Sequence, residues 1–447
     1  MLIAIILCFI IGYVIIAFEH PLKLDKTVPA LLMAALCWSF LSLGNMDVVN
    51  HLHEVVPLEE VLLHHIGKVA EILFFLLGAM TIVELIDLHE GFSVITNRIR
   101  TTSKKKLMFM LCILSFFLSA TLDNLASTIV LVSLLRRLVP HREERLWFVC
   151  MAVIGANAGG AWSPIGDVTT TMLWIGKKVT TVSLIEELFL PALFCIGIPA
   201  LIASFLPAFQ GHLTLPAVDE NSIHKKEKLL SSRTMLFAGV GGLIFVPIFK
   251  AITHLPPYAG MMLSLGFVWL ISEYIHPEED FTEERKHLYS ARHALSRIEL
   301  SSILFFLGIL MAVASLESVA VMGNHGKEVG MLMHMAEYLE SIIPNQEIVI
   351  LILGFLSAII DNVPLVAATM GMYPMDVFPI DHTLWHYIAY SAGTGGSMLI
   401  IGSAAGVAAM GMERIDFIWY FKKISWIALS GFLGGGAVYY LINLIFK

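Results

Sequence analysis

The amino-acid sequence predicts an all-α membrane protein made of two inverted repeats, and two observations lead to this prediction. The first is composition: 57% of the 447 residues are hydrophobic and only 14% are charged, whereas a soluble domain carries about 25% charged residues. The second is a set of motifs that recurs in the two halves of the chain. The composition is that of a helical membrane protein surrounded by lipid, and nothing in it indicates a nucleic-acid partner.

Long apolar runs are expected to cross the hydrocarbon core of a bilayer, roughly 30 Å thick, as helices. The expected spans are 2–18, 27–44, 69–87, 145–178, 183–206, 234–252, 258–276, 299–318, 383–412 and 418–446. Two of them, about 145–178 and 383–412, contain glycine-rich interruptions and are predicted to be broken helices, because glycine lets the backbone unwind.

Two further apolar stretches, about 107–138 and 346–372, each carry an Asp-Asn pair in the middle. We interpret each as a re-entrant hairpin that enters and leaves the membrane on one side. Backbone that stops being helical at membrane depth is tolerated only where protein or a water-filled cavity surrounds it. The two pairs are therefore expected inside the protein.

Three motifs recur in the same order and at nearly the same spacing. The segment from Phe117 to Asn124 matches that from Phe355 to Asn362, and the Ala-x-x-Gly-Gly and Ile-Leu-Phe-Phe-Leu motifs also recur. Each half then contains five spans and one hairpin, and an odd number of spans turns the second copy upside down. We predict a first repeat at 1–206, a cytoplasmic linker at 207–233 and a second repeat at 234–447. Inverted repeats with broken segments are typical of secondary transporters, whose site lies near the bilayer midplane.

Orientation follows from the basic residues. If the amino terminus is outside, most of the 28 lysines and arginines fall in segments that face the cytoplasm, as the positive-inside rule requires. Both termini are then predicted to be periplasmic.

The aspartates of the two hairpins, Asp123 and Asp361, are the sharpest functional signals. An acid at the centre of a span costs about 2.5–3.5 kcal/mol on insertion scales, so such residues are usually functional. The alternative is that each carboxylate only caps the following helix. The two roles are compatible, and Asn124 and Asn362 add amide oxygens beside them. Ser127 and Thr128 lie one turn further on, as ligands or as ordinary helix hydroxyls.

The broken helix of the first half carries more oxygen than its counterpart. Asn157, Asp167, Thr169 and Thr170 surround its interruption, whereas the matching positions in the second half are Gly393, Ser403, Ala405 and Gly406. Hard cations need several oxygen ligands at once, so the first half is predicted to hold the better cation site. Thr394 in the second interruption and Glu84 in an earlier span are weaker candidates. Glu84 is equally explained as an interface residue or as a partner for a basic side chain.

These motifs resemble the NhaD-type sodium/proton antiporters of the wider ion-transporter superfamily, over essentially the whole chain. The resemblance rests on the Asp-Asn pairs and on the run from Gly155 to Thr171. It implies exchange of Na⁺, and often Li⁺, for H⁺ in a bacterial inner membrane. It also implies a homodimer. The site residues that it implies are Asp123, Asn124, Asn157, Asp167, Thr169, Thr170, Asp361, Asn362 and Ser397.

The hypothesis for the mechanism is that cation and proton compete for shared carboxylates. Burial favours the neutral form of a carboxylate and a bound cation favours the ionised form. No enzyme activity and no cofactor are expected. One alternative is a Na⁺-coupled anion symporter, which would need a cationic site, and no lysine or arginine is evident inside the expected spans. The other is an intramembrane aspartyl hydrolase that uses Asp123 and Asp361 as a proton-sharing pair.

Overall fold

Helices make up nearly all of the regular structure in the computed structural model of the chain. The structure describes residues 1–447 except 18–21, 23, 51–53, 97–98, 100, 214–230, 276–290, 324–327, 344, 360 and 447. Among the described residues, seven helices are long and apolar enough to cross a membrane. The protein is therefore a multi-pass α-helical membrane protein.

The helices of the first half follow one another with short connections. They are α1 (Leu2–Ala17), α3 (Thr27–Leu43), α4 (Leu58–Leu88), α5 (Ser93–Thr96), α6 (Lys104–Leu122), α7 (Asn124–Leu138), α8 (Arg142–Gly160), α9 (Val168–Ile175) and α10 (Thr181–Ala203). A short 3-10 turn, Pro207–Phe209, follows. Most of the predicted linker, 207–233, lies outside the described residues.

The second half has a similar order of elements. Its helices are α11 (Ser231–Thr253), α12 (Pro257–Ile275), α14 (Ala291–Arg297), α15 (Leu300–Ser318), α16 (Met331–Ile342), α17 (Gln346–Ser357), α18 (Asn362–Met372), α19 (Thr383–Gly395), α20 (Ala404–Glu413), α21 (Phe417–Lys423) and α22 (Ser425–Phe446). Below, α6–α7 is called hairpin 1 and α17–α18 hairpin 2. The pairs α8–α9 and α19–α20 are the broken helices.

Two helix boundaries differ from the sequence prediction. Helix α4 begins at Leu58, well before the predicted span at 69–87, because its first turns are polar and carry Glu59 and Glu60. Acidic side chains favour a helix amino terminus, but they lower the hydropathy on which the span prediction relied. The last span, predicted at 418–446, is divided into α21 and α22 at Ile424.

Four short strands were not predicted at all. Strand β1 (Val48–Val49) pairs with β2 (Val55–Val56), and β3 (Ala320–Met322) pairs with β4 (Glu328–Gly330), both antiparallel. A bridge between Val48 and Val319 joins the loop after α3 to the loop after α15. These two loops therefore lie at the same end of the molecule.

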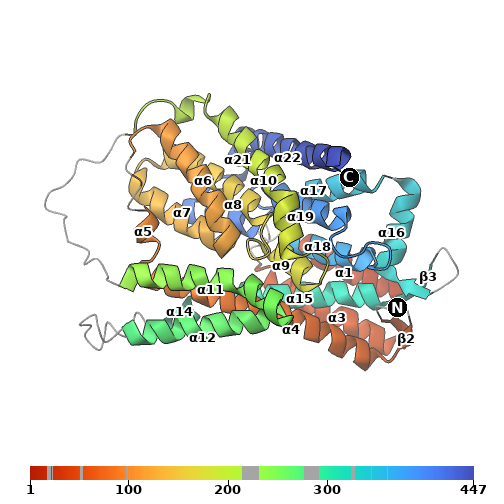
Figure 1. Ribbon diagram of the computed structural model, residues 1–447. Helices are drawn as coiled ribbons and strands as arrows, with labels where there is room; N and C mark the ends of the chain where they lie inside the picture. Colours follow the sequence, from red (N-terminus) through yellow and green to blue (C-terminus); the bar gives the residue numbers. More distant parts are fainter. Residues whose placement is uncertain are drawn as a thin grey trace.

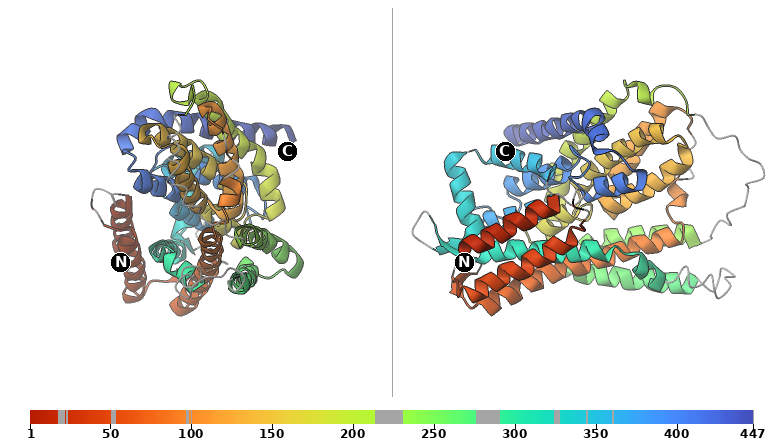
Figure 2. Two further views of the ribbon diagram at one scale, coloured as in Figure 1. Left: turned by 90° about the vertical axis from the view of Figure 1, so that its left-hand side faces the viewer. Right: turned by 180° about the vertical axis from the view of Figure 1, so that it is seen from behind.

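The helices form two layers, which Figures 1 and 2 show from several sides. The hairpins, the broken helices, α10 and α22 lie in the upper part of Figure 1, and α3, α4, α11, α12 and α15 lie below them. Helices α1 and α3 occupy one end of the lower layer, and α11 and α12 occupy the other. The helix pairs correspond between halves: α3 packs on α15 and α12 on α4, α6 on α8 and α17 on α19, and α10 on α22.

Glycines allow each broken helix to lie directly against its hairpin. A Cβ atom on Gly159 would lie 2.1 Å from the carbonyl oxygen of Phe116 in hairpin 1. A Cβ atom on Gly395 would lie 2.2 Å from the carbonyl oxygen of Gly354 in hairpin 2. Real Cβ atoms do not approach so closely, so any larger residue would push the hairpin away. Each contact brings one hairpin close to the broken helix of its own half.

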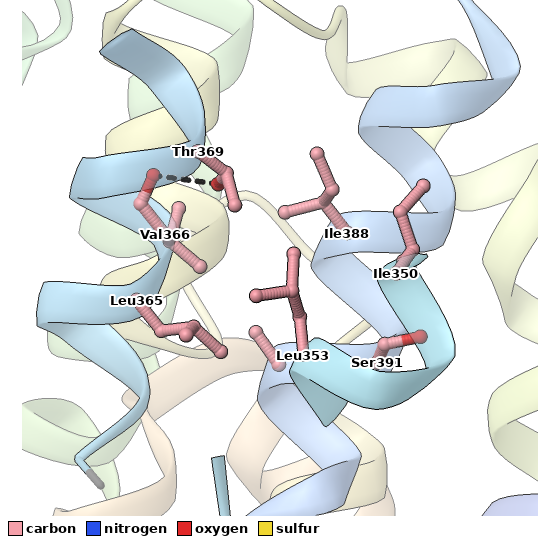
Figure 3. A pocket seen from close by; sticks show the side chains of 8 residues that line it. Ile350, Leu353, Leu365, Val366, Thr369, Ile388 and Ser391 are labelled. Atoms are coloured by element: carbon pink, nitrogen blue, oxygen red, sulfur yellow. Dashed lines mark hydrogen bonds between the residues drawn. The ribbon is translucent and has the colours of Figure 1, made fainter. Parts of the chain in front are cut away.

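Packing between hairpin and broken helix is less tight in the second half. A small apolar pocket lies between α17, α18 and α19, lined by Ile350, Leu353, Leu365, Val366, Thr369, Ile388, Ser391 and Ala392. Figure 3 shows these side chains, with the Thr369 hydroxyl donating to the Val366 carbonyl at 2.8 Å. In the first half Gly155 occupies the position of Ser391, and its Cβ position is already 2.0 Å from the Ser115 hydroxyl. The first half has no comparable room at that glycine.

We predict that Gly159→Ala destabilises the folded protein by about 1–3 kcal/mol, the usual cost of overpacking a core. The added methyl group would collide with the backbone of hairpin 1. Thermal unfolding of the purified protein in detergent measures the effect. The control is Gly197→Ala in α10, where a Cβ atom meets nothing within 4 Å. Equal melting temperatures for the two variants would contradict the close packing.

Candidate functional site

Each hairpin tip ends in an aspartate that directly precedes the second helix of the hairpin. Helix α6 ends at Leu122 and α7 begins at Asn124, so Asp123 caps α7, and its Oδ1 accepts the Ala126 N–H at 2.7 Å. Asp361 caps α18 in the same way, accepting the Val363 N–H at 3.3 Å. Both aspartates therefore cap a helix, as one interpretation of the sequence expected. The capping uses only Oδ1 of each carboxylate.

Asp123 is held in a strained backbone conformation. Its φ is +99°, a region that residues other than glycine rarely adopt, and such strain persists only where the surrounding structure imposes it. Strain of this kind clusters at functional sites. The tip of hairpin 1 is therefore a place where geometry takes precedence over local backbone preference.

Threonine hydroxyls form hydrogen bonds across the interruption of the first broken helix. Helix α8 ends at Gly160 and α9 begins at Val168. The Thr170 hydroxyl donates to the carbonyl oxygens of Ser163 at 2.7 Å and of Asp167 at 2.9 Å. Thr171 donates to the Pro164 carbonyl at 2.9 Å. These bonds tie the start of α9 to the backbone of the interruption.

Asp167 is the point on which both hairpin tips converge. Its carboxylate accepts Asn124 Nδ2 of hairpin 1 at 2.8 Å and Asn362 Nδ2 of hairpin 2 at 3.2 Å. It also caps α9 by accepting the Thr169 N–H at 3.0 Å. The residue is only 2% exposed. A single buried carboxylate thus joins two segments that are far apart in the sequence.

Asn157 extends this network into the second broken helix. Its Oδ1 accepts Asn124 Nδ2 at 3.1 Å, and its Nδ2 donates to the hydroxyls of Ser397 and Ser403, each at 2.9 Å. Asn157, Ser397 and Ser403 are all buried. Both hairpin tips and both helix interruptions are therefore joined by one connected set of side chains, which we call the Asp167 network.

Three buried hydroxyls near this network have no hydrogen-bond partner among the described residues. They are those of Ser127 and Thr128, one turn beyond Asp123 on α7, and that of Thr169 in α9, and all three side chains are fully buried. Buried polar atoms are normally paired, and an unpaired one needs an explanation. Oxygen ligands waiting for a hard cation provide one.

The two hairpin aspartates differ in their charged neighbours. Asp361 Oδ2 forms an ion pair with Lys26 Nζ at 2.9 Å. No cation pairs with Asp123 within the part of the chain that the structure describes. Lys26 lies just outside the expected span 27–44, so the expectation that the spans contain no lysine did not bring it to the site. Lys26 immediately precedes α3, and its side chain reaches the tip of hairpin 2.

Two weaker candidates have other partners. Glu84 Oε2 faces Arg297 at 3.3 Å, an ion pair between α4 and the end of α14. Thr394 donates its hydroxyl to the Tyr390 carbonyl at 2.6 Å, an ordinary bond within α19. Among the described residues, neither side chain has a hydrogen bond to a side chain of the Asp167 network, although the Thr394 carbonyl accepts the Ser397 N–H at 3.1 Å.

A buried charge cluster fastens hairpin 1 to the second broken helix at one end. The carboxylate of Glu413, at the end of α20, accepts Arg136 Nε at 2.7 Å and Arg145 Nε at 2.9 Å. Arg142 donates to the Glu413 and Arg414 carbonyls at 2.9 and 2.7 Å. The Glu413 side chain is 1% exposed. The cluster holds parts of both halves together.

Comparisons with known proteins agree with this architecture. A family model described as a citrate transporter matches residues 13–389. Sodium/proton antiporter 2 of Arabidopsis thaliana is 45% identical over 437 residues, 98% of this chain and 99% of that protein, and sodium/proton antiporter 1 is 46% identical over 442 residues, 99% and 72%. The Na(+)/H(+) antiporter NhaD of Alkalimonas amylolytica is 30% identical over 463 residues, 97% and 89%. The chain belongs to the NhaD-type family of sodium/proton antiporters.

Proposed function

We propose that this protein exchanges Na⁺, and also Li⁺, for H⁺, and that the two ions compete for the buried carboxylates Asp123 and Asp167. The observation that carries the proposal is the Asp167 network, in which two hairpin tips and two helix interruptions bring oxygen-bearing side chains together. The names of the relatives, plant and bacterial, support exchange of these two ions. We place the protein in a bacterial inner membrane.

The proposed site contains the oxygens that a hard cation prefers. Asp123 and Asp167 supply the charge, and Asn124, Asn157, Thr169, Ser127 and Thr128 supply neutral oxygens. Asn362, Ser397 and Thr170 complete the site from the second half and from the interruption of the first, and Asp361 lies beside Asn362 at the tip of hairpin 2. The side-chain amides of Asn124 and Asn362 donate to the Asp167 carboxylate, so a cation binds there by displacing these two donors.

Exchange follows because one carboxylate pair cannot hold both ions well. A bound proton removes the charge that attracts Na⁺, and bound Na⁺ favours the ionised carboxylates. If the site opens to one side of the membrane at a time, a proton that enters and a Na⁺ that leaves use the same groups in turn. Inward proton flow then drives Na⁺ out.

We also propose that the two halves are inverted repeats, with re-entrant hairpins and both termini on the periplasmic side. The corresponding helix pairs, the aspartate caps at both hairpin tips and the matching glycine contacts support this arrangement. The placement of α1 and α11 at opposite ends of the lower layer also supports it. Assembly as a homodimer is proposed from the family resemblance alone.

A Na⁺-coupled anion symporter is the second candidate, because a family model described as a citrate transporter matches the chain and Lys26 lies at the tip of hairpin 2. An anion, however, would have to compete with Asp361 for the lysine. The hydrolase alternative is weaker still. A proton-sharing aspartate pair requires two carboxyl groups that face each other, whereas the oxygens of Asp361 are engaged by Lys26 and by the Val363 N–H.

Asp123→Asn should abolish Na⁺-driven proton release while leaving the protein folded, because it removes a charge at nearly constant volume and an asparagine still caps α7. Dequenching of a pH-sensitive dye in everted vesicles after addition of Na⁺ measures exchange. The matched control is Asp416→Asn, because Asp416 caps α21 by accepting the Trp419 N–H at 2.8 Å and lies outside the site. Exchange at the wild-type rate by the Asp123 variant would exclude the proposed role.

The contribution of the first half is tested by removing single hydroxyls. Thr169→Ala should raise the apparent Na⁺ KM several-fold, on the scale of about 1–2 kcal/mol for a lost buried polar contact. Ser403→Ala should raise it less, because the Ser403 hydroxyl accepts Asn157 and the Gly406 N–H and occupies the position of Asp167 in the second half. Initial rates at graded Na⁺ concentrations give both values. Equal increases would show that the two halves contribute equally.

Orientation is tested with single cysteines at the two ends of the molecule. Cysteine at Met322 in β3, which is 64% exposed, should react with an impermeant thiol reagent in intact cells. Cysteine at Gln210, after the 3-10 turn that ends the first half, should react only after the cells are permeabilised. Of the five native cysteines, four are buried and one is partly buried, so an unsubstituted chain gives the background. The reverse labelling pattern would overturn the proposed orientation.

A further inference from the structure

We infer that the ammonium group of Lys26 neutralises the Asp361 carboxylate of the second half. Asp361 then anchors hairpin 2 and does not bind the transported ion. The inference rests on the proposed function and narrows it. It assigns exchange to Asp123 and Asp167, and it gives Asp361 a positioning role. Lys26 becomes a residue that determines which carboxylates are open to Na⁺.

Both oxygens of Asp361 are already engaged. Oδ1 accepts the Val363 N–H at 3.3 Å, and Oδ2 receives Lys26 Nζ at 2.9 Å. The ion pair is mostly shielded from solvent, since the two side chains are 20% and 12% exposed. Na⁺ could reach this carboxylate only by displacing an ammonium group that is covalently tethered beside it.

Lys26 is held in place from several sides. Its ammonium lies 4.4 Å from the centre of the Phe305 ring on α15, a cation–π contact. The next residue, Thr27, donates its hydroxyl to the Ser301 carbonyl at 3.0 Å, which fixes the start of α3 against α15. Asp25 accepts the Thr27 N–H at 2.8 Å. The lysine is therefore presented to hairpin 2 by an ordered segment of the lower helix layer.

The other titratable groups around the pair are few in the described part of the chain. Asp25 lies on the same segment, and Tyr13 on α1 faces Asp361. Asp167 is connected to the pair through Asn362, the neighbour of Asp361. None of these groups supplies a second cation, so the charge of Asp361 is balanced by Lys26.

Asp123, the aspartate of hairpin 1, has no counterpart of this lysine among the described residues. Asp123 uses Oδ1 for the Ala126 N–H, and no described cation pairs with its carboxylate. This difference matches the distribution of oxygens, since Asn157 and Asp167 belong to the first half while Gly393 and Ser403 take their places in the second. The tip of hairpin 1 can accept a cation from solution, whereas the tip of hairpin 2 is paired with a lysine that the first half supplies.

The test compares Asp361→Asn, Lys26→Gln, Lys26→Arg and the double variant Lys26→Gln with Asp361→Asn. Removing one member of a shielded ion pair costs far more than replacing both. Asp361→Asn should therefore lower exchange at least about tenfold, and the double variant should recover to within about threefold of wild type. Lys26→Arg keeps the charge and should retain most of the exchange. The readout is Na⁺-driven proton release by purified protein in proteoliposomes, with thermal unfolding as the check on folding.

Binding of radioactive Na⁺ to the purified protein in detergent is the second measurement. Lys26→Gln leaves Asp361 as an open carboxylate, and it should bind about twice as much Na⁺ as wild type at saturation, because a free buried carboxylate is a cation ligand. The additional binding should disappear in the double variant.

Two results would overturn the inference. One is a folded double variant that is as inactive as Asp361→Asn, which would make Asp361 a ligand of the transported ion. The other is a Lys26→Gln variant that binds no more Na⁺ than wild type. Failure of the proposed function itself is recognised separately, because Asp123→Asn would then exchange Na⁺ normally whatever the Lys26 variants do.

Discussion

The arrangement of the site depends on one buried carboxylate, that of Asp167. It accepts an amide from each hairpin and caps α9. An unsatisfied buried amide costs about 1–3 kcal/mol, so Asn124 and Asn362 hold the hairpin tips at this acceptor. The glycine contacts between the hairpins and the broken helices also hold the hairpins in place. Asp167 thus holds the two hairpin tips together and is also one of the carboxylates proposed to bind the transported ion. Binding of the ion would therefore disturb the contacts that hold the hairpins in place.

The sequence predicted the parts of the fold that depend on local pattern. Apolar runs gave the helices, the Asp-Asn pairs gave the hairpin tips, and the run from Gly155 to Thr171 gave the first interruption. The extension of α4 to Leu58 and the four short strands were missed, because polar loop residues carry little periodic signal. Hydropathy alone also did not separate α21 from α22.

Contacts between segments that are far apart in the sequence could not be predicted from local sequence patterns. The residue pattern placed Asn157 and Asp167 around one interruption and Asn124 beside Asp123, and the family resemblance grouped them with Asn362 and Ser397. Neither predicted the hydrogen bonds from Asn362 to Asp167 or from Asn157 to Ser397 and Ser403. Lys26 was missed because a lysine at the start of a helix normally reaches water. Its ion pair joins residues that are 335 positions apart, and no local rule predicts such a pair.

The charge cluster around Glu413 has a consequence for motion. Arg136 near the end of α7, and Arg142 and Arg145 in the first turn of α8, bind the carboxyl end of α20. They donate to the Glu413 side chain and to the last carbonyls of the helix. Separating these segments would leave the buried Glu413 carboxylate without its guanidinium partners, which is costly for a buried charge. We therefore expect hairpin 1 and α20 to move as one body in a rearrangement that opens the site. The hinges of that rearrangement have to lie elsewhere in the chain.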